Sequence, residues 1–171
     1  MDRLRPDYRI RPIDPSDRDA LSRFYAALSP DALIDRFHGA CRGIDDSAGR
    51  IFCGPDHEHR EGIIAETIPT DGEPPRIIGH LCLEPTRVGE VEMAIAVADD
   101  ERRRGIGRAL LTTSLAWAAG HGTHRLRASM RSSNGAILRL LRSSGSPLTM
   151  SVDDAGMVDA VLDLRYAVAA A

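Results

Sequence analysis

One stretch of the sequence, residues 90–111, constrains the fold more than any other. Its first part, Glu90–Val97, alternates between two sets of side chains, as a β-strand with two different faces does. Its second part carries three successive arginines and two glycines, Gly105 and Gly107, just before an apolar helical pattern that begins at Ala109. The stretch therefore predicts a strand, a basic glycine-containing loop, and a helix that starts from that loop.

A loop of this kind is suited to bind an anion. The first turn of a helix has backbone N–H groups without partners, and the helix dipole adds partial positive charge there. Glycine lets the backbone approach a bulky ligand, so the arrangement predicts a phosphate site that Arg102, Arg103 and Arg104 would strengthen. The alternative is a solvated arginine loop before an ordinary surface helix. The preceding strand and the two glycines favour the anion site.

The glycine spacing narrows the choice of anion. A P-loop requires a lysine, and all 22 basic residues of this chain are arginine. A dinucleotide fingerprint requires a third glycine, where Leu110 stands, and an acidic residue about 20 positions later, which the sequence near Arg127 lacks. The remaining pattern, Arg102-x-x-Gly105-x-Gly107, is similar to the (Gln/Arg)-x-x-Gly-x-(Gly/Ala) signature of the GNAT acetyltransferase superfamily. This resemblance implies a loop that holds the pyrophosphate of acetyl-CoA.

Length and composition set the broad class of protein. With 171 residues, 43% of them apolar and 27% charged, the chain is expected to be one globular domain, residues 1–171. A net charge of −3 argues against a nucleic-acid partner. Three cysteines form no even set, which favours free thiols in a reducing cytoplasm. We find no signal peptide and no membrane-spanning run, so no membrane partner is expected.

The other patterns predict an α/β (α+β) fold. The predicted strands are 8–13, 62–68, 76–84, 90–97, 124–130, 148–152 and 157–166, and the predicted helices follow Asp14, Ser29, the glycine loop and Asn134. Residues 38–61 give no clear pattern and are interpreted as a charged loop. The order β-α-α-β-β-β-α-β-α-β-β resembles a GNAT fold, a mixed and mostly antiparallel sheet of about seven strands flanked by helices.

Further segments support this resemblance and narrow it. Asn134–Gly145 looks like the family's Asn-containing helix. Ile10-Arg-Pro, Leu28–His38 and Val91–Val97 are similar to bacterial protein lysine acetyltransferases of the Pat type. The resemblance implies an acetyl-CoA-dependent N-acetyltransferase whose acceptor is a protein lysine or a small amine. Many GNAT enzymes carry a tyrosine general acid where this chain has Leu140–Arg142, so a tyrosine acid is not expected.

The proposed reaction needs a base, because an amine attacks a thioester only when it is neutral, and a lysine amine has a pKa of about 10.4. Glu92 is the candidate catalytic residue, since it stands at the position of the Pat-type strand glutamate. Ala94 and Ala96 on the same face would leave room for the cofactor. The alternatives are that Glu92 is a solvent-facing carboxylate or an arginine partner, or that Glu90, on the same face, is the base.

The resemblance also implies how acetyl-CoA is bound. Backbone groups of strand residues 95–97 would pair with the pantetheine arm, and an N–H group there would polarise the acetyl carbonyl. Loop amides would hold the pyrophosphate, and the asparagine would contact the pantetheine or the leaving thiol. The implied cofactor-binding residues are Ile95, Ala96, Val97, Arg102, Arg103, Arg104, Gly105, Ile106, Gly107, Arg108 and Asn134.

Several other residues are given less weight. His57 and His59, with Cys53 nearby, match no zinc spacing, so no metal is implied. His80 is interpreted as a hydrogen-bonded part of the sheet rather than a proton carrier, and nothing marks Cys82 as a nucleophile. A non-catalytic acyl-CoA-binding sensor with the same fold is the alternative function. The sequence leaves open the acyl-chain preference, and whether the chain is a monomer or a homodimer.

Overall fold

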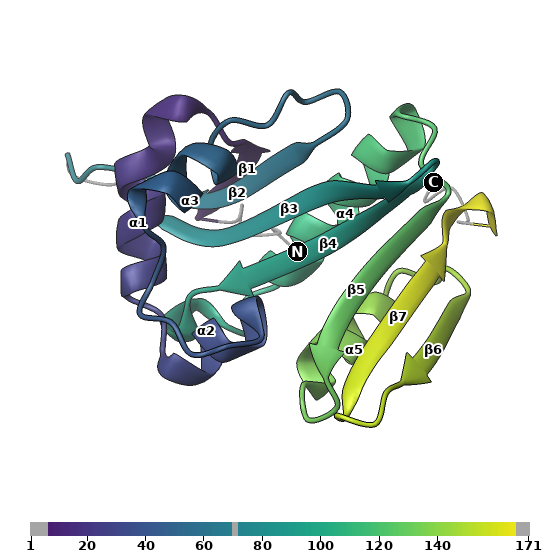
Figure 1. Ribbon diagram of the computed structural model, residues 1–171. Helices are drawn as coiled ribbons and strands as arrows, with labels where there is room; N and C mark the ends of the chain where they lie inside the picture. Colours follow the sequence, from purple (N-terminus) through teal and green to yellow (C-terminus); the bar gives the residue numbers. More distant parts are fainter. Residues whose placement is uncertain (1–6, 70–71, 167–171) are drawn as a thin grey trace, which may run out of the picture.

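The computed structural model describes residues 7–69 and 72–166, which form a seven-stranded sheet with helices on both faces (Figure 1). The strand order is β1-β2-β3-β4-β5-β7-β6, and every neighbouring pair is antiparallel except β4 and β5. The strands are β1 Tyr8–Pro12, β2 Glu61–Thr67, β3 Ile77–Arg87, β4 Glu90–Val97, β5 Arg125–Arg131, β6 Leu148–Val152 and β7 Met157–Asp163. The mixed, mostly antiparallel sheet predicted from the sequence is confirmed.

Five α-helices lie in the described residues: α1 Arg18–Ala26, α2 Pro30–Phe37, α3 Asp46–Phe52, α4 Ile106–Gly120 and α5 Gly135–Arg142. Helices α1, α2 and α3 cover one face of the sheet, and α4 and α5 cover the other (Figure 1). Within residues 7–69 and 72–166, no helix is both long and apolar enough to cross a membrane.

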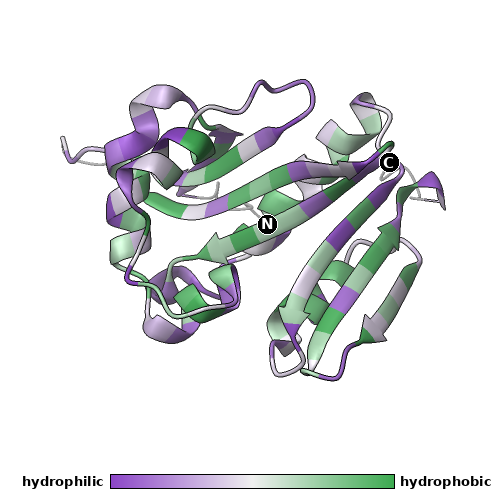
Figure 2. Cartoon of the chain, viewed as in Figure 1, coloured by the Kyte–Doolittle hydropathy of each residue, from purple (hydrophilic) through white to green (hydrophobic). Residues whose placement is uncertain are grey.

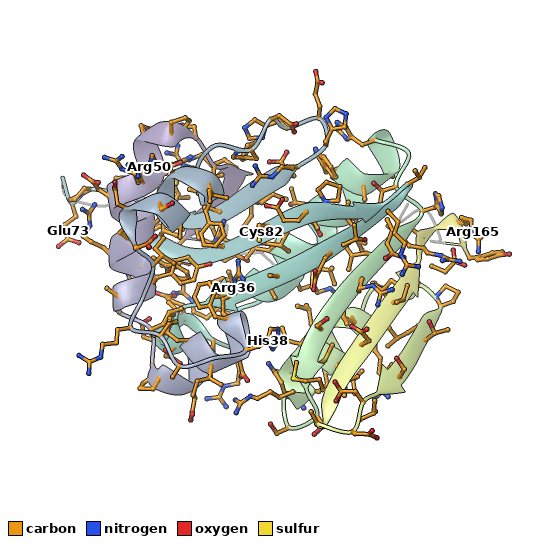
Figure 3. All side chains as sticks on the ribbon, viewed as in Figure 1. Arg36, His38, Arg50, Glu73, Cys82 and Arg165 are labelled. Atoms are coloured by element: carbon orange, nitrogen blue, oxygen red, sulfur yellow. The ribbon has the colours of Figure 1, made fainter. Side chains whose placement is uncertain are left out.

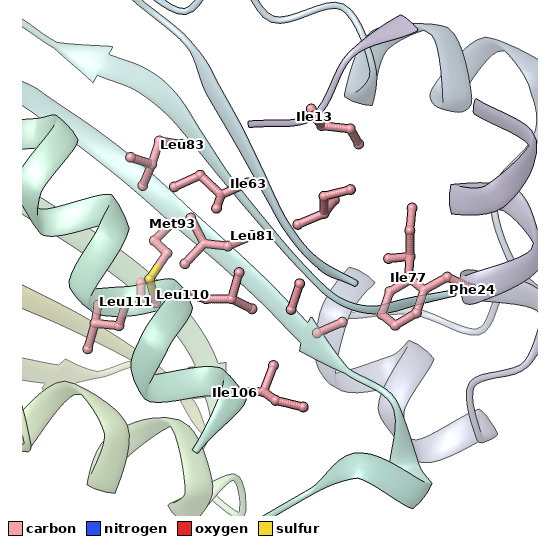
Figure 4. Close-up of a cluster of buried hydrophobic side chains, with 14 of the residues drawn as sticks. Ile13, Phe24, Ile63, Ile77, Leu81, Leu83, Met93, Ile106, Leu110 and Leu111 are labelled. Carbon is pink, nitrogen blue, oxygen red and sulfur yellow. The ribbon is translucent and has the colours of Figure 1, made fainter. Parts of the chain in front are cut away.

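Helix α4 packs across the middle of the sheet because its apolar residues recur at helical spacing. The buried residues at this contact are Ile106, Leu110 and Leu111 from the helix and Ile63, Leu81, Leu83 and Met93 from the strands (Figure 4). Gly79 lets the helix come close to β3, since a Cβ atom there would lie 3.0 Å from side-chain carbons of Ile106 and Leu110. Apolar residues run along the central strands, whereas the segment before β2 is largely polar (Figure 2).

An ion-pair cluster joins β1, at one edge of the sheet, to β2 and to the segment that follows β1. The Arg11 guanidinium on β1 donates to Glu66 of β2 at 2.8 Å and to Asp17 at 2.7 Å. Asp17 closes the short 3-10 helix Pro15–Asp17. Hydrogen bonds from Arg11, outweighing burial, lower the pKa of the Glu66 carboxyl below its ordinary value.

The structure corrects the sequence analysis in one element and in several boundaries. Residues 38–61 are not entirely a loop, because Asp46–Phe52 form α3 with Asp45 as its cap. This helix has only seven residues and contains Gly49, so its apolar pattern is too short to detect. The observed order is therefore β-α-α-α-β-β-β-α-β-α-β-β. The last strand ends at Asp163, and a 3-10 turn, Leu164–Tyr166, follows it.

Candidate functional site

The sheet opens between β4 and β5. These parallel strands pair only at their start, where residues 90–92 lie opposite residues 125–127. Beyond this point the two strands diverge (Figure 1), and in the described part of the chain Met93–Val97 have no strand partner on that side. Backbone N–H and C=O groups on a free strand edge need partners, so this edge can bind an extended ligand as it would bind another strand.

A narrow cleft occupies the opening. Its lining residues are Asp35, Arg36 and His38 at the end of α2, Glu92, Met93, Ala94 and Ile95 of β4, Ala128, Ser129 and Met130 of β5, and Asn134 and Ile137 at the start of α5. Three of the predicted site residues, Glu92, Ile95 and Asn134, therefore line one cleft. Ala96 and Val97 lie further along β4, outside this lining.

Glu92 is only partly buried and lies where the two strands separate. The Ser129 hydroxyl on β5 is 3.4 Å from its Oε1 atom and 2.7 Å from Oδ1 of Asp159 on β7. Among the described residues Glu92 has no ion-pair partner. A hydroxyl has a single hydrogen, and the shorter contact shows that Ser129 donates it to Asp159. The Glu92 carboxylate is therefore accessible from the cleft and is not held by a strong hydrogen bond.

Glu90 has different surroundings, although it lies on the same face of β4. It is 4% exposed, and its Oε1 atom accepts hydrogen bonds from Thr86 at 3.0 Å and Arg127 at 3.2 Å. Burial alone would raise the pKa of this carboxyl, but the bonds from Thr86 and Arg127 and the arginine charge lower it. Arg127 also binds Asp159 at 2.8 Å. Glu90 is thus an ion-pair partner and does not line the cleft.

The arginine loop connects β4 to α4 through a short 3-10 helix, Asp99–Glu101. Gly105 has a φ of 84° and is the N-cap residue of α4, and it offers no side chain to cap the helix. The first-turn amides of Ile106, Gly107 and Arg108 thus have no side-chain cap, in contrast to the first turn of α2, which Ser29 caps. These amides and the helix dipole favour an anion at this end of α4.

The arginines of the loop differ in their partners. Arg102 pairs with Asp99 at 2.8 Å, and Arg104 pairs with Glu101. Arg103, which has a φ of 63°, and Arg108 are exposed and have no ion-pair partner within residues 7–69 and 72–166. Backbone amides, Arg103 and Arg108 are therefore the groups most available to an anion.

Asn134 links the cleft to α5. Its Oδ1 atom accepts the N–H of Ile137 at 3.3 Å and so caps the helix. The amide nitrogen of the same side chain remains able to donate a hydrogen bond to a ligand in the cleft.

A buried polar cluster lies beside the cleft, on the face of the sheet that α1, α2 and α3 cover. Arg36 Nε donates to Tyr25 Oη at 3.2 Å, and the Tyr25 hydroxyl lies 2.8 Å from His80 Nδ1. Burial lowers the pKa of His80 to about 3, assisted by the Arg36 charge, so His80 is neutral at pH 7. Burial raises the pKa of the Cys82 thiol, which lies 3.1 Å from Arg36 Nη2 (Figure 3).

This cluster supports the structural interpretation of His80 and Cys82. The sequence analysis does not identify Arg36, because it predicts the helix after Ser29 only as an element of the fold. The signal was present in the sequence: Arg36 falls at helical spacing from Leu33, on the side that α2 buries.

The histidines that precede β2 have local partners. His57 Nδ1 lies 2.8 Å from Glu61, and His59 Nδ1 lies 3.2 Å from Asp56. In the part of the chain that the structure describes, no group of three or more His, Cys, Asp or Glu side chains could hold a metal ion.

Comparisons with known proteins agree with this geometry. A model of the acetyltransferase (GNAT) family matches residues 21–145. The chain is similar to the solved GNAT domain of PAT from S. lividans, with 25% identity and a TM-score of 0.80, over 91% of this chain and 90% of that one.

Two further solved structures share the fold at lower identity. The first is yncA from Salmonella typhimurium, solved with its cofactor acetyl-CoA, with 22% identity and a TM-score of 0.75 over 92% of this chain and 94% of that one. The second is a ribosomal-protein-alanine N-acetyltransferase from Brucella melitensis, with 20% identity and a TM-score of 0.69 over 91% of this chain and 99% of that one.

Proposed function

The chain belongs to the GNAT family of acetyltransferases, and we propose that it moves the acetyl group of acetyl-CoA to a primary amine with Glu92 as the general base. The acceptor is a small amine or a protein lysine. One observation carries the proposal: Glu92 is a cleft carboxylate without an ion-pair partner in the described residues, and it lies where the free edge of β4 begins.

The proposed position of acetyl-CoA follows from two features. The free edge of β4, including Ile95, Ala96 and Val97, would bind the amide groups of the pantetheine arm as an added strand. The first-turn amides of α4, with Arg103 and Arg108, would bind the pyrophosphate. Asn134 would donate its side-chain N–H group to the pantetheine or to the sulfur.

The reaction then needs little more than a base and a polarised carbonyl. The amine nitrogen attacks the thioester carbon, so a C–N bond forms and the C–S bond breaks. Glu92 takes the amine proton, directly or through one water. A thiol of ordinary pKa, about 8.5, can leave as the thiolate and take a proton from water. A tyrosine acid is therefore dispensable at the position of Leu140 on α5.

We also propose that residues 1–171 act as one domain in a reducing cytoplasm. The described strands belong to a single sheet. Cys41, Cys53 and Cys82 are all free thiols, as is usual in that compartment.

The test is a CoA-release assay with a panel of amines, comparing wild type with Glu92→Gln. We expect kcat/KM to fall about 10²- to 10⁴-fold, while calorimetry gives an unchanged affinity for acetyl-CoA. Glu84→Gln is the matched control, because Glu84 lies opposite Glu92 on β3, is bound by Arg60 at 2.6 Å, and does not line the cleft. The chain has no lysine, so release without an acceptor reports only hydrolysis and reaction at the N-terminal amine.

Three results would change this conclusion. Full turnover by Glu92→Gln would remove Glu92 as the base. Tight binding of acetyl-CoA without CoA release for any amine would favour the acyl-CoA sensor. No heat and no affinity for CoA or its thioesters would remove both functions.

A further inference from the structure

Some charged side chains of the cleft have no partner of opposite charge among the described residues. Asp35 accepts a hydrogen bond from Arg131 Nε at 2.8 Å, and this pair joins α2 to the end of β5. Glu92 and Arg36 have no oppositely charged partner within residues 7–69 and 72–166. His38 is the remaining titratable residue of the lining, and it is exposed. The cleft thus presents one unpaired anion and one unpaired cation.

The unpaired charge of Arg36 is unusual because the residue is buried, with only 9% of it exposed. Its Nε and Nη2 atoms donate to Tyr25 Oη and Cys82 Sγ, which are both neutral: burial raises the pKa of Tyr25 to about 12. The guanidinium carbon lies 4.9 Å from the Phe37 ring centre and 5.3 Å from that of Phe52.

The third guanidinium nitrogen, Nη1 of Arg36, has no hydrogen-bond partner in the described part of the chain. A buried cation is costly without a counter-charge, and aromatic rings and neutral acceptors compensate it only in part. An anionic group from a ligand would complete the site.

Arg36 reaches the same face of the sheet that carries Glu92. Cys82, which Arg36 contacts, lies opposite Ala94 across β3 and β4, and Ala94 is the next residue after Glu92 on the same face. The backbone positions of Glu92 and Cys82 are thus about 7 Å apart along the strand and about 5 Å apart across it. The Arg36 guanidinium, which α2 carries, reaches the sheet at Cys82. Because the side chains of Glu92 and Arg36 both line the cleft, they can approach the amine and the carboxylate of a single small ligand.

We propose, resting on the acetyl transfer argued above, that the acceptor is an α-amino acid whose amine meets Glu92 and whose carboxylate binds Arg36. A guanidinium binds a carboxylate through charge-assisted hydrogen bonds. A lysine side chain within a protein brings an amine but no carboxylate, and would leave Arg36 unpaired. Arg36 is therefore the residue that sets acceptor specificity.

The experiment measures CoA release with each α-amino acid, its carboxamide and a lysine peptide blocked at both ends. The carboxamide keeps the amine and removes the anion. The amine of the carboxamide is also less basic, so more of it is in the neutral form that attacks the thioester. In an enzyme without a carboxylate site, the carboxamide would therefore be the better acceptor. We expect the best amino acid to exceed its carboxamide in kcat/KM by roughly 10- to 100-fold, as for a charged hydrogen bond.

The variant Arg36→Met should lower the ratio of kcat/KM for the amino acid to kcat/KM for its carboxamide by the same factor. Arg36→Lys should restore part of the preference. Arg50→Met is the matched control, because Arg50 is an exposed arginine of α3 outside the cleft (Figure 3). Acetyl-CoA affinity of each variant reports whether the fold and the cofactor site are intact.

The outcomes separate this proposal from the previous one. A wild type that prefers the blocked lysine peptide, or uses the carboxamide as well as the amino acid, overturns the amino-acid assignment and leaves acetyl transfer intact. An equal loss for both acceptors in Arg36→Met makes Arg36 a structural residue only. If Arg36→Met does not fold, the comparison of the amino acid with its carboxamide in wild type still decides whether the acceptor carboxylate is recognised. No CoA release with any acceptor removes both proposals.

Discussion

Glu90 and Glu92 lie two residues apart on one face of β4, yet their surroundings differ. Glu90 is buried and bound by Thr86 and Arg127, whereas Glu92 lines the cleft and contacts Ser129. The alternation of the strand puts both carboxylates on the same face and cannot distinguish them. The distinction comes from β5, which is paired beside Glu90 and diverges beyond Glu92.

The first prediction is that Glu90→Gln lowers stability and preserves activity. Arg127 would lose a buried carboxylate partner, which should reduce the free energy of unfolding by about 1–3 kcal/mol. The value of kcat/KM should stay within about threefold of wild type, a difference under about 1 kcal/mol. Urea denaturation and CoA release measure the two effects. If Glu90→Gln abolishes turnover and Glu92→Gln does not, Glu90 is the base.

At the scale of the element, the unit β4–loop–α4 connects the site to the core. The apolar face of α4 fixes the helix on the sheet through Ile106 and Leu110. Its first turn is then held at the end of β4, where Gly105 reverses the chain with a φ of 84°. The two glycines therefore differ in backbone conformation. Gly105 has a conformation that other residues rarely adopt, whereas Gly107 lies in the first turn of α4.

The second prediction contrasts alanine at the two glycines. Gly105→Ala should reduce the free energy of unfolding by about 1–2 kcal/mol, because its backbone is left-handed. Gly107→Ala should raise that free energy by up to about 1 kcal/mol, because alanine favours a helix and the new Cβ would lie 3.7 Å from Leu140, an ordinary contact.

Thermal and urea unfolding of both variants check this second prediction, and calorimetry with CoA checks the site. Affinity of Gly107→Ala for CoA should remain within about threefold of wild type. If Gly107→Ala is less stable than wild type, or if Gly105→Ala is as stable as wild type, the result contradicts the assignment. That assignment is that Gly105 has a left-handed backbone and Gly107 does not.

At the scale of the whole molecule, ion pairs of arginine connect elements that are distant in sequence. Arg11 joins β1 to β2, and Arg131 joins β5 to α2. Glu66 is 2% exposed, and its carboxylate accepts hydrogen bonds from Arg11 and Arg9. Its pKa is lowered in the folded state, so folding is favoured when this group is ionised.

The third prediction concerns acid stability. A depressed carboxyl pKa contributes stability that is complete above the ordinary value of 4.5 and is lost as pH falls through the lower, folded value. Glu66→Gln should therefore reduce the free energy of unfolding by about 1–3 kcal/mol at pH 7, and by progressively less below pH 4.5.

Urea midpoints of wild type and Glu66→Gln, measured from pH 7 to pH 3, test the third prediction. Glu58→Gln is the control, because Glu58 is exposed. A difference between wild type and Glu66→Gln that grows as the pH falls would contradict the ion-pair interpretation.

Local patterns in the sequence determined much of this protein. Alternation and helical spacing depend on neighbours within a few residues, so the strands, the α4 helix and the glycine loop could be predicted, and the GNAT resemblance is confirmed by the family match over residues 21–145. Helix α3 could not be predicted, since a seven-residue helix is stabilised by packing rather than by its own pattern.

The tertiary structure alone decided which charges are paired. Glu90 and Arg127, Asp35 and Arg131, and Glu66 and Arg11 are each far apart in the chain and meet only in the folded sheet. The same long-range pairing leaves Glu92 and Arg36 without opposite charges in the described residues. An electrostatic partner is fixed by distance in space, which the sheet register and the divergence of β4 and β5 determine.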